Sequence, residues 1–265
     1  MYYLEIIKPG SFIKLDDHQL AWKIQSNIDC LISFFYRANA ALNLFIENNN
    51  RVDWLQSPKN EVEFDAFAQA SIKRSQDIEE IIRSSEPGIS NDDLLLKKII
   101  YERHESWRGG KIPTQISSNL SFICAEAFVF SLDIFAKYFL IFSNEEGAPD
   151  GMPDIYKKIS QNFPDLIDIR NSAHHSEDRV RGLEGMGKNK KNIPLDILVD
   201  EKNPASGTHA LTIGLLSGNI YKTTLKDGRI GEIEVSLKSM EILQSIMNET
   251  LNAFEWTGQR QHLPC

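Results

Sequence analysis

The chain has 265 residues, of which 25% are charged and 42% hydrophobic, the proportions of an ordinary globular protein. Its formal net charge of −8 argues against broad, non-specific binding to nucleic acid, because such binding neutralises many phosphates. A local basic cleft remains compatible with that charge. The three cysteines, Cys30, Cys124 and Cys265, lie far apart without metal-ligand spacing, so we expect no metal site and no other cofactor.

The sequence lacks the pattern of a signal peptide at its N-terminus. Its strongest apolar run, from Phe122 to Phe142, is interrupted by Glu126, Asp133 and Lys137. Such charges are costly in the apolar part of a bilayer. We therefore expect a cytoplasmic protein that does not enter a membrane.

Apolar residues at helical spacing predict four long helices before residue 144. A short strand over residues 2–7 precedes them. The helices are expected at residues 17–47, 61–84, 91–107 and 118–143. Polar residues that can cap a helix come before three of them: Asp16 or Asp17, Ser90 or Asn91, and Ser117 or Ser118.

The second half of the chain changes from helical to alternating patterns. A short helix is expected at Asp154–Gln161, and another begins at Pro164, which suits the first helical position, and runs to about residue 181. Alternation then predicts strands at 193–199, 209–216, 219–225 and 229–235. Ser217–Gly218 and Asp227–Gly228 stand where two-residue hairpin turns would fall. Ser236 caps a closing helix.

These elements predict a mainly α fold. An up-and-down helical bundle is expected at residues 12–183. Residues 184–258 are expected to form a small antiparallel β-meander with the closing helix. With short strands, this part is more stable packed on the bundle than alone, so we expect the two to be in contact.

The helix that begins at Pro164 carries the residues best suited to chemistry, Arg170, Asn171, His174 and His175. Residues four apart lie on one helix face, and the fifth is only partly round from it. Arginine is permanently charged and binds phosphate oxygens through paired N–H groups. Histidine gains or loses a proton near neutral pH. This combination predicts a site that binds or cleaves a phosphodiester.

The chain reads Arg170-Asn171-x-x-His174-His175, followed by Glu177-Asp178-Arg179. This pattern resembles the Arg-x4-His signature of the HEPN superfamily, and most of all a bacterial branch that reads Arg-Asn-x-x-Glu-His-x-Asp-Glu-Arg. Here His174 replaces the Glu, and the later acidic pair is reversed. Active HEPN domains are helical, metal-independent ribonucleases that usually dimerise, so that Arg and His of both protomers meet in one cleft. Other members bind nucleotides, antitoxins or partner proteins.

The resemblance implies that Arg170 and His175 form the central pair, with Asn171 and His174 assisting. A histidine would move protons to and from the ribose hydroxyl and the leaving oxygen, and Arg170 would stabilise the charged phosphorane. Five basic residues follow the motif and could bind the RNA backbone or form a solvated loop. They are Arg179, Arg181, Lys188, Lys190 and Lys191.

Three hypotheses for the function remain open. The first is a homodimeric endoribonuclease of toxin or defence type, acting on RNA and controlled by an antitoxin or partner protein. The second is a non-catalytic HEPN-like module that dimerises or binds a nucleotide, in which Arg170 pairs with Asp168, Asp178 or an acidic neighbour in the bundle. The third is a small-molecule pocket between bundle and meander, away from Arg170.

Overall fold

The computed structural model describes residues 1–52, 61–174, 183–184, 191–192, 212 and 214–265. The chain divides into two compact units: unit 1 comprises residues 1–47 and 121–265, and unit 2 comprises residues 48–120. The prediction of a mainly helical chain with small antiparallel sheets near its C-terminus is confirmed. The predicted domain boundary at residue 183 borders residues that the structure does not describe and stays a prediction.

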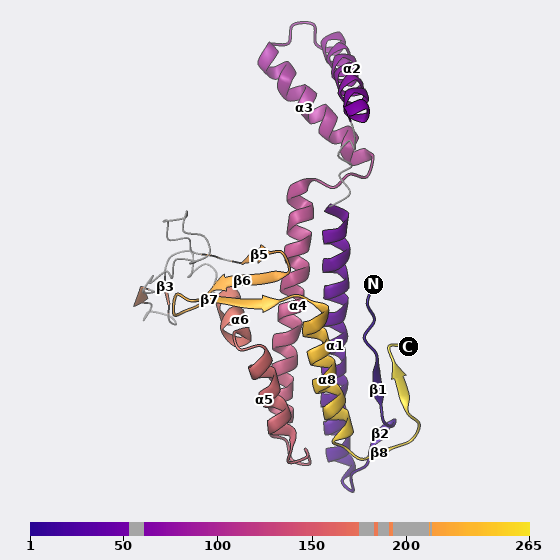
Figure 1. Cartoon of the computed structure of the whole chain (residues 1–265), viewed down its shortest axis with the longest axis vertical. Coiled ribbons are helices and arrows are strands. Elements are labelled where there is room, and N and C mark those ends of the chain that lie inside the picture. Colours follow the sequence, from indigo (N-terminus) through magenta and orange to yellow (C-terminus); the bar gives the residue numbers. More distant parts are fainter. Residues whose placement is uncertain (53–60, 175–182, 185–190, 193–211, 213) are drawn as a thin grey trace. The chain divides into compact units, whose positions relative to one another are not determined.

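The helices follow the predicted order (Figure 1). Their bounds are α1 His18–Val52, α2 Glu61–Ser85, α3 Asn91–Arg108, α4 Thr114–Phe142, α5 Met152–Asn162, α6 Leu166–His174 and α8 Leu237–Asn252. α4 begins a turn earlier than predicted, because the carbonyl of Pro113 accepts the first helical hydrogen bond, from Ser117 N at 2.9 Å. α6 begins at Leu166 rather than Pro164, because its first bond runs from Ile169 N to Asp165 O, at 2.8 Å.

The described strands form four small antiparallel sheets. The termini are paired with each other, β1 (Ile6–Lys8) with β9 (Gln261–Leu263) and β2 (Phe12–Ile13) with β8 (Trp256–Thr257). β3 (Leu183–Glu184) pairs with β4 (Lys191–Asn192). The predicted meander is the sheet of β5 (Leu215–Ser217), β6 (Ile220–Thr224) and β7 (Ile230–Glu234). The strand predicted at 193–199 lies outside the described residues.

The two turns of this meander differ from the prediction. The β5–β6 turn consists of Gly218 and Asn219, one residue later than expected, with Gly218 at a φ of 63°. Glycine adopts this left-handed conformation without the strain that a side chain causes. Strands β6 and β7 are joined by residues 225–229, a longer loop than the expected two-residue turn.

The core of unit 1 is a single hydrophobic cluster. The predicted α1 stripe is buried in it, together with one face of α4, α8 and the inner side of the meander. The wholly buried aromatic side chains include Phe35, Phe128, Phe135 and Phe139. Asp17 caps α1, since its Oδ1 accepts hydrogen bonds from the backbone N–H groups of Gln19 and Leu20 at 2.8 and 3.1 Å. Local capping and apolar spacing therefore place α1 as predicted.

Among the described helices, α4 alone is long and apolar enough, by length and composition, to cross a bilayer. Half of its most apolar window is buried inside the chain, as in the core helix of a soluble protein. Helix length and composition are therefore weak support for a membrane span here.

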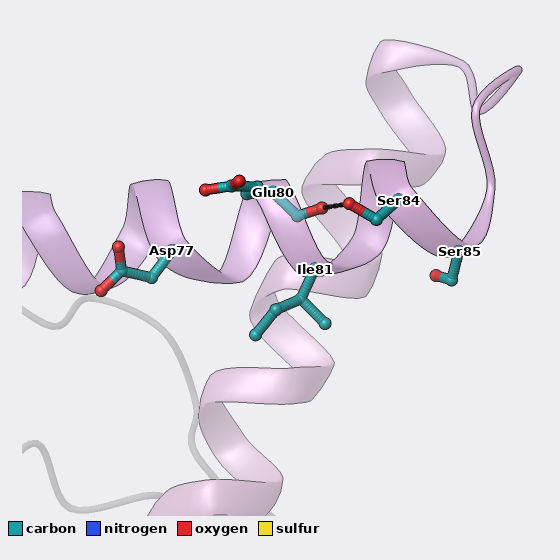
Figure 2. A pocket seen from close by; sticks show the side chains of 5 residues that line it. All are labelled: Asp77, Glu80, Ile81, Ser84 and Ser85. Atoms are coloured by element: carbon teal, nitrogen blue, oxygen red, sulfur yellow. Dashed lines mark hydrogen bonds between the residues drawn. The ribbon is translucent and has the colours of Figure 1, made fainter.

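Unit 2 contains an antiparallel pair of helices, α2 and α3, whose described core is small. Ile78, Ile82 and Leu94 form its buried cluster, with Ile89 and Tyr101 packed against them. At the C-terminal end of α2, one helix face forms a shallow hollow (Figure 2). The residues that line it are Asp77, Glu80, Ile81, Ser84 and Ser85.

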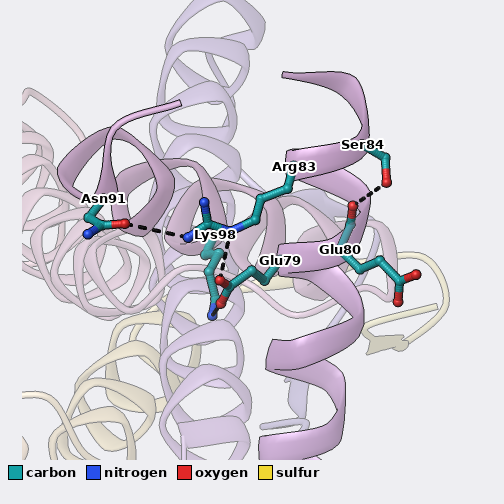
Figure 3. Close-up of polar contacts among 6 residues, drawn as sticks. All are labelled: Glu79, Glu80, Arg83, Ser84, Asn91 and Lys98. Atoms are coloured by element: carbon teal, nitrogen blue, oxygen red, sulfur yellow. Dashed lines mark hydrogen bonds and ion pairs between the residues drawn. The ribbon is translucent and has the colours of Figure 1, made fainter. Parts of the chain in front are cut away.

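An ion pair on the surface joins α2 to α3 (Figure 3). Glu79 of α2 accepts from Arg83 at 2.9 Å and from Lys98 of α3 at 3.0 Å, so it links the two helices. Arg83, followed by Lys98, holds the pKa of the Glu79 carboxyl below its usual value. Ser90 caps α3 by accepting a hydrogen bond from the backbone N–H of Asp93, as predicted.

Candidate functional site

The helix α6, which carries the predicted motif, is attached to the meander at its first residues. Arg229 Nη1 lies 2.6 Å from Asp165 Oδ1, and the backbone N–H of Glu232 donates to the other carboxylate oxygen at 3.2 Å. Ile169 is fully buried one turn later. A Cβ built on Gly231 of β7 would lie only 2.9 Å from Ile169 Cγ1, so the absence of a side chain there allows the close approach. These contacts fix the position of the α6 backbone next to Arg170.

Arg170 is oriented by a buried carboxylate on α4. Its Nε lies 3.3 Å from Oδ2 of Asp133, whose side chain is 1% exposed. Lys137 Nζ lies 2.7 Å from the same oxygen. Among the described residues neither Asp133 oxygen has a partner with hydrogen-bond geometry, so these contacts are ion pairs rather than aligned hydrogen bonds. The Arg170 side chain is still 27% exposed, so it also reaches the surface.

Arg170 borders an open cleft with a volume of about 320 Å³ in unit 1. The cleft lies between α4, α6 and β6. Its lining residues are Glu126, Ala127, Val129 and Phe130 from α4, Arg170 and Ala173 from α6, and Tyr221 from β6. Most of this lining is apolar or aromatic, and one permanent cation stands at its edge. Such a site suits a ligand that combines a flat apolar group with an anion.

Two polar groups of the cleft have raised pKa values. Burial raises the pKa of the Glu126 carboxyl, against a smaller opposing effect of the hydrogen bond from Tyr221. Burial likewise raises the pKa of the Tyr221 hydroxyl, with a further contribution from the nearby Glu126 carboxylate. Tyr221 donates to Glu126 Oε1 at 3.4 Å. The pair therefore contributes hydrogen-bonding groups to the lining of the cleft.

The structure describes only part of the predicted site. Arg170 lies at the cleft, Asn171 is half-buried beside it on α6, and His174 is the last described residue of that helix. Lys191 lies in β4, where its backbone is paired with Glu184. The remaining predicted site residues lie outside the described residues: His175, Arg179, Arg181, Lys188 and Lys190.

Of the three partners expected for Arg170, Asp168 pairs elsewhere and Asp178 lies outside the described residues. Asp168 pairs with Lys226 at 3.5 Å, and the Arg170 partner described here is Asp133, an acidic neighbour in the bundle. An apolar cleft between helices and meander is present, as the third hypothesis expects. That cleft includes Arg170, however, instead of lying away from it.

Asp133, Glu126 and Tyr221 were not predicted as site residues. Their signal was weak: Asp133 and Glu126 appear in the sequence as charges that interrupt an apolar run, and Tyr221 as one residue of a strand. The hollow on α2 is a poorer candidate for the predicted phosphate chemistry, since two carboxylates line it (Figure 2). Within the described ranges, no group of three or more His, Cys, Asp or Glu side chains could hold a metal ion.

Comparisons of the chain with protein-family models, with curated proteins and with solved structures found no match.

Proposed function

We propose that this chain is a HEPN-like cytoplasmic protein whose up-and-down bundle presents Arg170 to the phosphate of an RNA strand, and that it cleaves this RNA without a metal ion. The observation that carries the proposal is the position of Arg170, which borders an open cleft while a buried carboxylate orients it. Because Asp133 contacts Nε, the two terminal nitrogens of the guanidinium can bind phosphate oxygens as a pair.

The rest of the cleft suits the base of the same nucleotide. Phe130, which is 47% exposed, supplies an aromatic ring, and bases stack on aromatic side chains with little regard to sequence. The Glu126 carboxyl, which accepts a hydrogen bond from the Tyr221 hydroxyl, can also accept one from a base edge.

The proposed reaction is attack of the ribose 2′-oxygen on the adjacent phosphorus. His175 removes the 2′-hydroxyl proton, the phosphorus–5′-oxygen bond breaks, and His174 or the protonated His175 supplies a proton to the leaving oxygen. Arg170 stabilises the extra negative charge of the phosphorane, and Asn171 orients the phosphate. The products are a 2′,3′-cyclic phosphate and a 5′-hydroxyl. In this proposal the protein is a homodimer, and the basic residues after the motif hold the RNA backbone.

Cleavage of single-stranded RNA in EDTA tests the proposal. We expect wild-type protein to cleave, and Arg170→Ala and His175→Ala each to reduce the rate on the order of 100-fold or more. Arg260→Ala and His262→Ala are matched controls, because both residues are exposed in unit 1 and do not line the cleft; they should cleave like wild type. Equal cleavage by all five proteins, or none by wild type, would contradict the proposal.

A second candidate function is favoured by the ion pair itself. A guanidinium beside a buried carboxylate can serve the structure alone, in which case the protein is a non-catalytic HEPN-like module that binds a nucleotide or partner protein. Fluorescence anisotropy with a labelled nucleotide separates the two. Binding that Arg170→Ala abolishes, with no cleavage by wild type, would support the module; cleavage dependent on His175 would exclude it.

A further inference from the structure

The two faces of α3 differ in what covers them. The face toward α2 holds Leu94, which is buried, and Tyr101, which is half-buried. On the same side Lys98 pairs with Glu79 of α2 (Figure 3). Five large apolar side chains lie on the rest of the helix, and all are between 37% and 61% exposed. They are Leu95, Leu96, Ile99, Ile100 and Trp107.

These side chains form a continuous stripe with two charges in it. At about 100° per residue, the stripe centres on the side of α3 opposite Leu94. Asp92 begins it, one turn before Leu96, and Arg103 interrupts it between Ile100 and Trp107. We call this surface the α3 stripe; it consists of Asp92, Leu95, Leu96, Ile99, Ile100, Arg103 and Trp107. Its spacing of three and four residues is that of a helix packed against another helix.

The exposed apolar area of the α3 stripe is large enough for a stable contact. With roughly 200 Å² for each large side chain, the exposed fractions give on the order of 500 Å² per copy. Apolar atoms make up about 60% of a protein interface, so the whole contact would bury about 800 Å² per copy. That is the usual size for one side of a specific interface. Apolar patches of this size on the surface of a monomer are often functional.

The charges of the stripe point to a second copy as the partner. In an antiparallel pair with its two-fold axis between Ile99 and Ile100, Leu96 of one copy lies opposite Arg103 of the other. Asp92 is one turn from Leu96, so Arg103 of one copy comes within reach of Asp92 of the other, twice by symmetry. A parallel pair would instead place like charges together. The stripe is therefore complementary to itself in the antiparallel orientation.

We propose that the α3 stripe is the surface through which two copies of this chain bind each other, as an antiparallel helix pair. This contact lies in unit 2, whereas Arg170 and its cleft lie in unit 1. It does not depend on the ribonuclease proposal, and its test requires no RNA.

Sedimentation equilibrium of the full chain, over a range of concentrations, measures the dimer directly. We expect wild type to dimerise and Ile99→Asp to raise the dissociation constant at least 100-fold, because it places two carboxylates at the two-fold axis. The matched control is Ile81→Asp: Ile81 is 51% exposed on α2, off the stripe, so this variant should dimerise like wild type.

Charge exchange tests the antiparallel register. Asp92→Arg and Arg103→Asp should each weaken the dimer about tenfold, and the double variant should restore it to within a few-fold of wild type, since the pairs re-form with reversed sign. All four positions changed in these tests are on the surface, so folding should survive, as circular dichroism can verify. A wild type that stays monomeric, a dimer unaffected by Ile99→Asp, or a double variant as weak as the singles would overturn the proposal.

Discussion

The contact between Arg170 and Asp133 can be measured by a double-mutant cycle in protein stability. Arg170→Ala leaves the buried Asp133 carboxylate with Lys137 as its described partner. Removing one member of a fully buried pair costs about 3–5 kcal/mol, because the remaining charge is uncompensated. Arg170 is partly exposed and Lys137 stays at 2.7 Å, so we expect a smaller loss, about 2 kcal/mol.

The losses expected for Asp133→Asn and for the double variant depend on how exposed the remaining charged side chains are. Asp133→Asn removes the buried charge and leaves two cations whose side chains reach solvent, so it should cost about 1 kcal/mol. The double variant should lose little more than this, which gives a coupling energy of roughly 1–2 kcal/mol. Urea unfolding followed by far-ultraviolet circular dichroism provides the free energies, provided that the slope with denaturant stays constant.

An exposed ion pair on α5 provides the control for this cycle. Asp154→Asn breaks an exposed ion pair with Lys157 in the first turn of α5 and should shift the unfolding midpoint much less than Arg170→Ala does. If the losses of Arg170→Ala and Asp133→Asn simply add in the double variant, the two side chains are energetically independent. The claim that Asp133 orients Arg170 would then be refuted.

Two further predictions concern the surroundings of the cleft. Burial raises the pKa of Glu126 in the folded state, so the stability linked to its protonation is present at low pH and is lost as pH rises through the folded-state pKa. Glu126→Gln should therefore unfold at a higher urea concentration than wild type at pH 7. The difference should vanish below about pH 4. A difference that does not depend on pH would contradict burial of the Glu126 carboxyl as its cause. Gly231→Ala should cost about 1–3 kcal/mol, because its Cβ would meet Leu225 at 2.7 Å and Ile169 at 2.9 Å. Gly88→Ala, with no atom within 4 Å of the new Cβ, is its control, and equal midpoints for the two variants would show that the crowding is relieved freely.

The features that the sequence predicts correctly depend on residues that are close together along the chain. The buried stripe of α1 is visible as apolar spacing, and the caps Asp17, Ser90 and Ser236 each bond to a backbone N–H two or three residues later. Such interactions involve a single turn of chain, so local composition determines them. The motif helix was found for the same reason, although its first residue was misplaced by two.

The features that the sequence does not predict depend on partners that are far away along the chain. Strands β8 and β9 have few residues each, and they form because β2 and β1 provide backbone partners from the other end of the chain. The role of Asp133 beside Arg170 likewise requires knowing that α4 packs against α6. The β5–β6 turn moved by one residue because Gly218, rather than Ser217, occupies the left-handed position. Apolar alternation alone does not specify such a register.

The pairing of β1 with β9 and of β2 with β8 has a consequence for synthesis of this protein on the ribosome. Residues 6–13 leave the ribosome before residues 256–263, which contain their strand partners. β1 and β2 therefore stay without these partners while residues 14–255 are synthesised. The α2–α3 pair, with partners close in sequence, can form much earlier. Chaperone binding to β1 and β2 of the nascent chain is thus expected to last until β8 and β9 emerge.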